Sequence, residues 1–368
     1  MKSLCLFLSL FVSTIISTTT HAQTLPSSPS FFKSDSDCVI TIPNYVTAAQ
    51  KKAKSAGLLK LALVPVTDAA NPADTNPLSA GRGAVAQNFQ MGTYDVKASE
   101  YCQFLNAVAS KSDPYALYND KMNSNPNVAS ISRTREADGS FTYSTKMAAS
   151  DLPIAYVSWF AAARFCNWMH NGQLIGNEDA TTTETGAYAL NGAMKDENGT
   201  ATVAKSDYCK LSDGAKFFLP TEDQWYKAAY YKRTGTADYW DYPTKSDTAP
   251  TNQNNGLANA ANFFIASNAD NSNSLFSHWN YQYSNGGKAP FLTTVGAFRK
   301  SPGPYGTFDM GGNLFQWVSD PGYAGTRVIR GGSWKKQQND ELKRTTCITA
   351  NPAIGYEFVG FRIAAPAQ

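Results

Sequence analysis

The stretch YGTFDMGGNLFQW, residues 305–317, carries the strongest structural signal in the chain. A glycine pair set among aromatic and apolar residues is typical of a tight turn that leads into a short strand. The pattern returns in RVIRGGSW at 327–334 and in VGFRI at 359–363. We therefore expect brief strands joined by glycine turns in the C-terminal part of the chain.

Upstream of this stretch, three amphipathic helices are predicted. Apolar residues recur at helical spacing over 98–109, which indicates the first helix. A second helix is expected after Ser158, because serine is a favoured N-cap residue. In LPTEDQW at 219–225, Thr221 and Gln224 have the spacing of a capping box and predict the start of the third.

Elsewhere the sequence predicts little regular structure. We expect a short helix over 51–63 and a strand over 89–92, both ahead of the first amphipathic helix. Residues 171–216 and 235–290 are rich in Asn, Gly, Thr and Ser and indicate long loops. Loops of this length in a folded domain need an organiser, either a bound metal or dense aromatic packing. The sequence offers the second, with 19 Tyr, 20 Phe and 7 Trp.

The N-terminus has the features of a secretory signal peptide. Lys2 precedes an apolar run that ends at Ile16, and Ala22 is a small residue suited to cleavage. We expect residues 1–22 to be removed, residues 23–84 to form a lead-in with the first strand or helix elements, and residues 85–368 to form the main domain. Because no later apolar stretch approaches the ~18 residues of a membrane span, we expect an exported protein, periplasmic or extracellular, without a stable membrane anchor.

Charge and residue counts exclude several classes of function. The 32 basic and 29 acidic residues give a net charge of +3, so no strong field favours nucleic acid as a partner. The three histidines are His21, His170 and His278, and the first lies in the leader, which excludes a metal site with three histidine ligands. The five cysteines that follow the leader can form at most two disulfides in an oxidising compartment.

Taken in order, the segments LPTEDQW, YGTFDMGGNLFQW, RVIRGGSW and GFR (360–362) resemble the formylglycine-generating enzyme, or sulfatase-modifying factor, family. VSW at 157–159 and FCNW at 165–168 extend the resemblance. The segment 71–119 looks like the exported bacterial branch of that family. The resemblance implies an α+β fold related to C-type lectins, with little regular secondary structure, long loops and bound calcium.

Family enzymes oxidise a sulfatase cysteine to formylglycine with O2 and with copper held by two cysteines. The matching positions here are Lys336 and Glu341. An ammonium group repels Cu(I) and a lone carboxylate is a hard ligand, so copper is not expected. We therefore expect a non-catalytic, monomeric member of the family that binds a protein, peptide or glycan. The alternative is an oxidoreductase of the formylglycine-generating type, or another enzyme that uses the same groove.

The resemblance assigns the ligand-binding surface to the C-terminal loops. Its expected residues are Ser333, Trp334, Lys336, Glu341, Arg344 and Tyr356. The alternative for the charged members of this set is a solvated loop without a ligand, because charge runs usually face water.

The resemblance also implies two calcium sites. The first uses Asn262, the carbonyl of Phe263 and Asp270, and the second uses Gly312, Asn313 and Gln316. The glutamine retains an oxygen donor but lacks the charge of a carboxylate, which should weaken binding. The alternative is that these amides hydrogen-bond the loop backbone without a metal.

In the family, the cysteine that matches Cys166 bridges to the residue after GFR, which here is Ile363. Because Cys102 has a similar position beside an apolar helical face, we expect a disulfide between Cys102 and Cys166. The alternative is a pair of buried free thiols.

Overall fold

Short strands joined by glycine turns form the centre of the fold, as the C-terminal motifs predict. In the computed structural model, a sheet of order β10-β7-β8-β9 is built from β7 (Phe315–Pro321), β8 (Arg327–Arg330), β9 (Ile348–Ala350) and β10 (Val359–Phe361). Strand β10 runs parallel to β7, and the other pairs are antiparallel. The structure describes residues 57–79, 81–194, 210–268, 279–335 and 339–367, which all belong to the unit Val46–Gln368.

A second sheet joins the two ends of the described chain. It has the order β1-β2-β11 and consists of β1 (Leu63–Val66), β2 (Phe89–Gly92) and β11 (Ala364–Pro366). Strand β2 is the predicted strand, whereas the helix predicted over 51–63 is wrong where it is described, since residues 57–62 are not helical. Proline at 65 and the valines beside it disfavour helix and suit β1. This sheet uses residues on both sides of the boundary predicted at residue 85.

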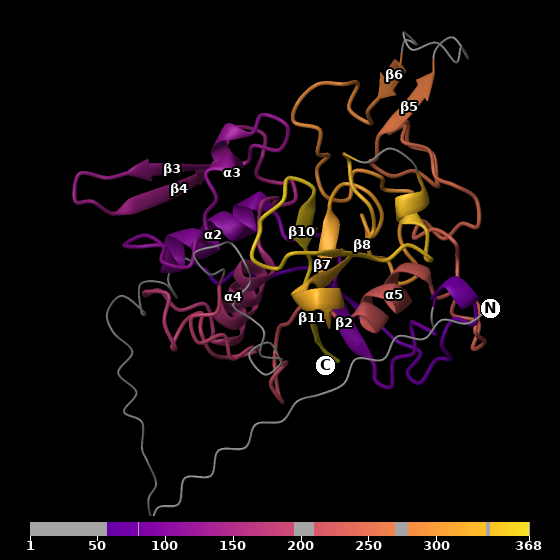
Figure 1. Ribbon diagram of the computed structural model, residues 1–368, viewed down its shortest axis with the longest axis horizontal. Helices are drawn as coiled ribbons and strands as arrows, with labels where there is room; N and C mark the ends of the chain where they lie inside the picture. The colour runs from indigo at the N-terminus through magenta and orange to yellow at the C-terminus, as the bar shows by residue number, and fades with distance from the viewer. Residues whose placement is uncertain (1–56, 80, 195–209, 269–278, 336–338, 368) are drawn as a thin grey trace, which may run out of the picture. The chain divides into compact units, whose positions relative to one another are not determined.

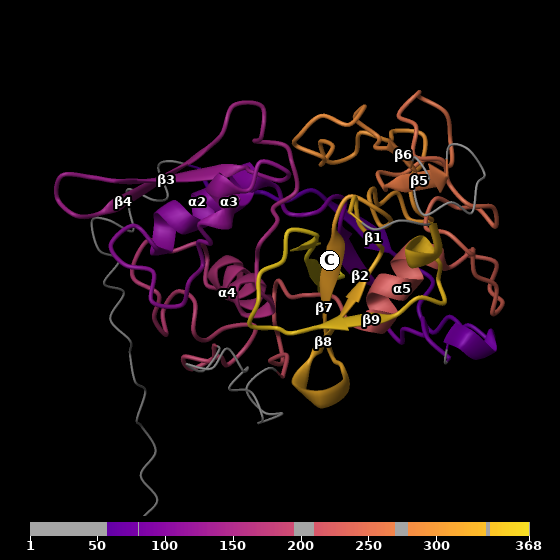
Figure 2. The same ribbon diagram turned by 45° about the horizontal axis from the view of Figure 1, so that its top comes forward.

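The three predicted amphipathic helices are confirmed as α2 (Ala98–Val108), α4 (Trp159–His170) and α5 (Glu222–Tyr230). The Ser158 hydroxyl accepts a hydrogen bond from the Ala161 amide at 3.1 Å. At α5, Thr221 and Gln224 form the reciprocal capping box. In both Figure 1 and Figure 2, α2 and α4 lie on one side of the central sheet and α5 lies on the other.

Two hairpins fall in segments where no strand was expected. The first is β3 (Ile131–Arg135) with β4 (Phe141–Thr145), and the second, inside the predicted 235–290 loop, is β5 (Ile265–Asn268) with β6 (Trp279–Gln282). Strands of four or five residues give too short an alternation to stand out in sequence. The remaining elements are α3 (Lys121–Ser124), η1 (Pro77–Ser79), η2 (Tyr323–Gly325) and η3 (Asn339–Leu342). No helix within the described ranges is long and apolar enough to cross a bilayer.

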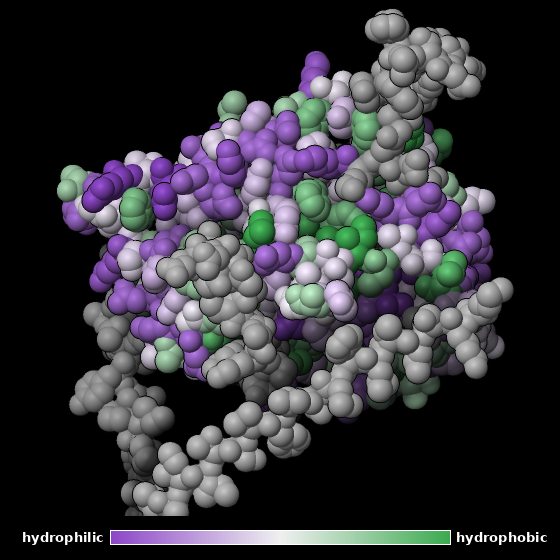
Figure 3. Space-filling view, viewed as in Figure 1, coloured by the Kyte–Doolittle hydropathy of each residue, from purple (hydrophilic) through white to green (hydrophobic). Residues whose placement is uncertain are grey.

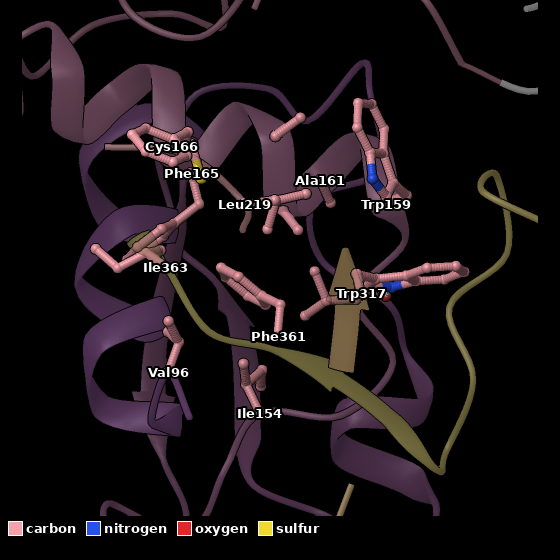
Figure 4. Packing of buried hydrophobic residues seen from close by; sticks show 14 of the residues in the cluster. Val96, Ile154, Trp159, Ala161, Phe165, Cys166, Leu219, Trp317, Phe361 and Ile363 are labelled. Carbon is pink, nitrogen blue, oxygen red and sulfur yellow. Dashed lines mark hydrogen bonds between the residues drawn. The ribbon is translucent and has the colours of Figure 1, made fainter. Parts of the chain in front are cut away.

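Aromatic packing organises the core where helix α4 meets the central sheet (Figure 4). Trp159 donates its indole N–H to the Val318 carbonyl at 2.9 Å, and Trp317 donates to the Val157 carbonyl at 2.9 Å. This exchange ties helix α4 to strand β7. Phe361 of β10 packs edge to face against Phe165 of α4, with ring centroids 5.4 Å apart. Dense aromatic packing is therefore present in the core between α4 and the central sheet.

The predicted bridge between Cys102 and Cys166 is wrong, because both residues are free thiols. Helix α2 turns Phe104 toward α4, with its ring 5.3 Å from that of Trp168. Cys102 lies two residues earlier, on another face of the helix, and its sulfur contacts the Asn106 amide at 3.6 Å. Cys166 is instead buried within the core beside the aromatic cluster of Figure 4.

The face shown in Figure 3 is largely hydrophilic, with hydrophobic residues gathered near its middle, where Figure 1 places β8 and β10. Among the residues that the structure describes, the most exposed large hydrophobic side chains are outside β8 and β10, at Met147 and Tyr323, which are 98% and 89% exposed. Single exposed hydrophobic residues are common on soluble domains and do not define a binding surface by themselves.

Candidate functional site

The residues that form the recognisable motifs meet one another in the interior at Gln316. The side-chain oxygen of Gln316 accepts hydrogen bonds from the Trp225 indole at 2.6 Å and from Arg362 Nε at 2.7 Å. Its amide nitrogen donates to the Asp309 carbonyl at 2.7 Å. Three separate motifs are thus joined by one buried side chain.

A second motif contact involves Arg330 of β8 and Glu222 at the start of α5. Arg330 Nε donates to Glu222 at 2.8 Å, and Arg82 pairs with the same carboxylate at 2.8 Å. The Cys347 thiol donates to it at 3.4 Å. Burial raises the pKa of the Cys347 thiol, and the Glu222 charge adds to that effect. The thiol is therefore held in its protonated form, which is a poor nucleophile and a poor metal ligand.

The expected ligand surface does not form one exposed patch. Ser333 and Trp334 are buried, at 1% and 3% exposure. The Trp334 ring stacks on Phe291 with centroids 5.1 Å apart, and its indole donates to the Glu357 carbonyl at 3.2 Å. Half-buried Tyr356 accepts a hydrogen bond from the Asn351 amide at 3.3 Å. Ser333 and Trp334 are therefore part of the packed interior and are not exposed to a ligand.

The charged members of that set lie further along the chain. The Arg344 guanidinium forms two ion pairs, through Nη1 with Asp74 and through Nε with Asp241, each at 2.9 Å. Glu341 lies in η3, and Lys336 falls outside the described residues. Between 333 and 346 the sequence contains no cysteine. The residues present therefore do not fit copper, which requires soft ligands here.

The first predicted calcium site is described in part. Asn262 donates through Nδ2 to the Phe291 carbonyl at 2.9 Å and to Asn313 at 3.0 Å. Because the Asn262 Nδ2 atom is used in this way, its Oδ1 atom is the one that could bind a cation. The Phe263 carbonyl accepts from Asn252 at 3.2 Å, and Asp270 lies outside the described residues. Calcium at this position stays a prediction.

The second predicted calcium site does not fit the ion. The Gln316 side-chain oxygen accepts hydrogen bonds from Trp225 and from the Arg362 guanidinium. A cation could not approach that oxygen without displacing a fixed positive charge. The Asn313 oxygen accepts from Asn262 and from the Thr293 amide at 3.2 Å, and Gly312 donates its own amide to the Gly331 carbonyl at 2.8 Å. Asn313 and Gln316 each also bond a backbone group, Thr293 and Asp309 respectively, as the alternative without a metal expects.

A pocket that the sequence did not indicate lies between the loop 113–120, the start of α4 and the loop 353–355. It encloses about 320 Å3, and Tyr115, Tyr118, Tyr156 and Phe160 supply four aromatic rings to its lining. Tyr156 has a φ of 63°, which is rare for a bulky residue. The sequence signal that could have suggested it is weak: two tyrosines, Tyr115 and Tyr118, shortly before Asn119 in a loop.

One wall of this pocket is held by a pair of acidic side chains. Asp113 accepts hydrogen bonds from the amides of Leu117 and Tyr118 at 2.7 and 2.9 Å. Buried Glu178 accepts from the Tyr115 amide at 3.2 Å and lies within hydrogen-bond reach of the Asp113 carboxyl. Burial and then the Asp113 charge raise the pKa of Glu178 to about 9. Glu178 is therefore protonated at neutral pH and can donate that proton in a hydrogen bond to the Asp113 carboxyl.

Several solved structures are similar to this chain at low sequence identity. Among solved structures, the chain is similar to the crystal structure of CarF, with 15% identity over 84% of this chain and 100% of CarF and a TM-score of 0.46. Treponema denticola variable protein 1 has 16% identity over 84% of this chain and 97% of its own, with a TM-score of 0.45. PvdO from Pseudomonas aeruginosa has 14% identity over 83% and 94%, with a TM-score of 0.44. No curated protein matches the sequence.

The family assignment comes from a family model. Residues 60–367 match the model described as "Sulfatase-modifying factor enzyme 1-like domain". The match covers most of the chain, and the α+β fold with little regular secondary structure that the motifs predict is confirmed. The chain therefore belongs to the sulfatase-modifying factor family, whose members include formylglycine-generating enzymes.

Proposed function

We propose that this protein is an exported, non-catalytic member of its family that binds a ligand on a rigid, loop-rich scaffold. The observation that carries the proposal is the arrangement of the thiols. The described cysteines are three separate free thiols, with Cys102 and Cys166 buried and Cys347 bonded to Glu222. Copper chemistry by the family route needs two neighbouring thiolates, and Glu341 offers only a hard ligand at one of the two positions.

The first test is the family reaction itself. We expect no formylglycine on a Cys-x-Pro-x-Arg peptide incubated with the purified protein, Cu(I) and O2, measured by mass spectrometry. The conversion replaces the thiol by an aldehyde and lowers the peptide mass by about 18 Da, an amount that follows from the chemistry of the family reaction. A protein-dependent product above a no-protein control would instead support the oxidoreductase alternative.

The proposal includes calcium at the first predicted site, around Asn262 and the Phe263 carbonyl. We expect chelation with EDTA to lower the melting temperature of the protein, because an ion bound only to the folded state stabilises it. At free calcium ~100 times its Kd the gain is about 2.7 kcal/mol. Asn262→Ala should abolish the response to chelator, whereas Asn88→Ala, which removes an exposed amide outside the site, should retain it. An unchanged melting curve for the unmodified protein would contradict the calcium proposal.

A further inference from the structure

The four-ring pocket also presents neutral polar groups. The Tyr156 hydroxyl accepts from the Asn125 amide at 2.6 Å, so its own hydrogen is available for donation. The Ser158 hydroxyl accepts from the Ala161 amide and likewise keeps its hydrogen. Asn119, also in the lining, uses only its oxygen locally, on the Lys121 amide at 3.0 Å. Aromatic faces and unused neutral donors therefore line one cavity.

Two of the rings already have a cation against them. The Arg164 guanidinium lies 4.0 Å from the centroid of the Tyr115 ring, and the Arg133 guanidinium lies 4.7 Å from that of Tyr118. Neither arginine is in the pocket lining. Each guanidinium attracts the π electrons of its ring toward itself. A second cation on the pocket side of these rings would meet a weakened aromatic face and a repelling charge behind it.

An anionic ligand is disfavoured for a different reason. The lining residues that the structure describes include no lysine or arginine, and their one charged side chain is Asp120. Its carboxylate pairs with Arg133 at 3.0 Å and is largely exposed, so it would add repulsion without offering a bond to an anion. What remains is a neutral ligand that has apolar C–H faces for the rings and hydroxyl groups for the donors.

We propose that this pocket binds a neutral sugar ring, stacked on Tyr115 and hydrogen-bonded through Asn119, Ser158 and Tyr156. The inference rests on the proposed binding function and names its ligand class. The volume of about 320 Å3 lies at the lower end of ligand pockets, which suits one or two rings of a longer glycan. Sugar C–H groups carry almost no charge and gain dispersion contact with an aromatic face, so the guanidinium behind the ring, which repels a full cation, opposes them far less.

The test uses the purified protein and three uncharged probes, maltotriose, cellotriose and triacetylchitotriose, in saturation-transfer NMR followed by titration calorimetry. We expect at least one of them to bind, with transfer to its ring C–H protons. Tyr115→Ala should weaken that binding about tenfold, the equivalent of about 1.4 kcal/mol. Tyr115→Phe, which keeps the ring, and Tyr323→Ala, which removes an 89%-exposed ring elsewhere, should leave it unchanged.

Asn119→Ala provides a second variant whose substitution touches only a surface loop, in case Tyr115→Ala does not fold. Failure of all three sugars to bind, or equal affinity in both pocket variants and the unmodified protein, would overturn the sugar assignment. Binding of a tri-arginine peptide that Tyr115→Ala abolishes would overturn it too, while leaving a binding function intact. Formylglycine production would defeat the proposed function itself, so the two failures are distinguishable.

Discussion

Arg362→Leu is expected to destabilise the protein by about 3–5 kcal/mol, the usual cost of removing one partner from a buried ion pair. Arg362 has no exposed side-chain surface and pairs with Asp95 at 3.1 Å. It also donates to the Gly92 carbonyl at 2.8 Å, to the Phe308 carbonyl at 2.7 Å and to Gln316. The substitution leaves a buried carboxyl and several buried acceptors without partners.

The measurement is the free energy of unfolding by denaturant titration. Arg233→Leu is the matched control, because Arg233 is 46% exposed and its pair with Asp68 is screened by solvent. That variant should lose less than about 1 kcal/mol. Equal losses in the two variants would show that the Arg362 cluster contributes no more than a surface ion pair.

The free energy of unfolding of the unmodified protein should fall as pH rises because Glu178 loses its proton. Glu178→Gln is expected to abolish this part of the pH dependence. Burial and the Asp113 charge raise the pKa of Glu178 from 4.5 to about 9 in the folded protein. The folded state therefore holds a proton that the unfolded state releases above pH 4.5. The stabilisation from Glu178 is complete below pH 4.5 and is lost as pH rises toward 9.

The glutamine amide mimics the protonated acid, since it can donate to Asp113 and accept from the Tyr115 amide. Between pH 5 and pH 9 the free energy of unfolding should fall by at least about 1.4 kcal/mol more in the unmodified protein than in Glu178→Gln, the equivalent of one pKa unit. The groups that face Glu178 from α2, α4 and β4 are Tyr101, Arg164 and Tyr143. The Arg164 charge is already paired with Glu184 at 2.6 Å, so it does not replace the proton.

The comparison of variants is needed because other buried carboxyl groups with a raised pKa also lower the free energy of unfolding as pH rises. Burial raises the pKa of Asp309 to about 6, for example. The exposed carboxylate variant Glu136→Gln controls for the loss of one negative charge and should follow the unmodified protein across the pH range. Parallel stability profiles for the unmodified protein and Glu178→Gln would show that Glu178 is ionised in the folded state.

Local chemistry determined the elements that the sequence could predict. Ser158 and the pair Thr221 and Gln224 fix helix starts through bonds that span three residues, so their effect does not depend on distant parts of the chain. The apolar spacing in 98–109 and the glycine turns near 311 and 331 are equally local. These features, with the motifs, were sufficient for the fold class and the family.

Only the tertiary structure decided which side chains meet. The sequence treats Gln316 as a calcium ligand, but the fold brings Trp225 and Arg362 to its oxygen from 91 and 46 residues away. The aromatic pocket likewise joins Tyr115 to the start of α4 and to the loop 353–355. Cys102 does not pair with Cys166 because it lies two helical steps, about 200°, from Phe104, which faces α4. Pairings of this kind depend on the angle and depth at which elements pack, and a local pattern contains neither.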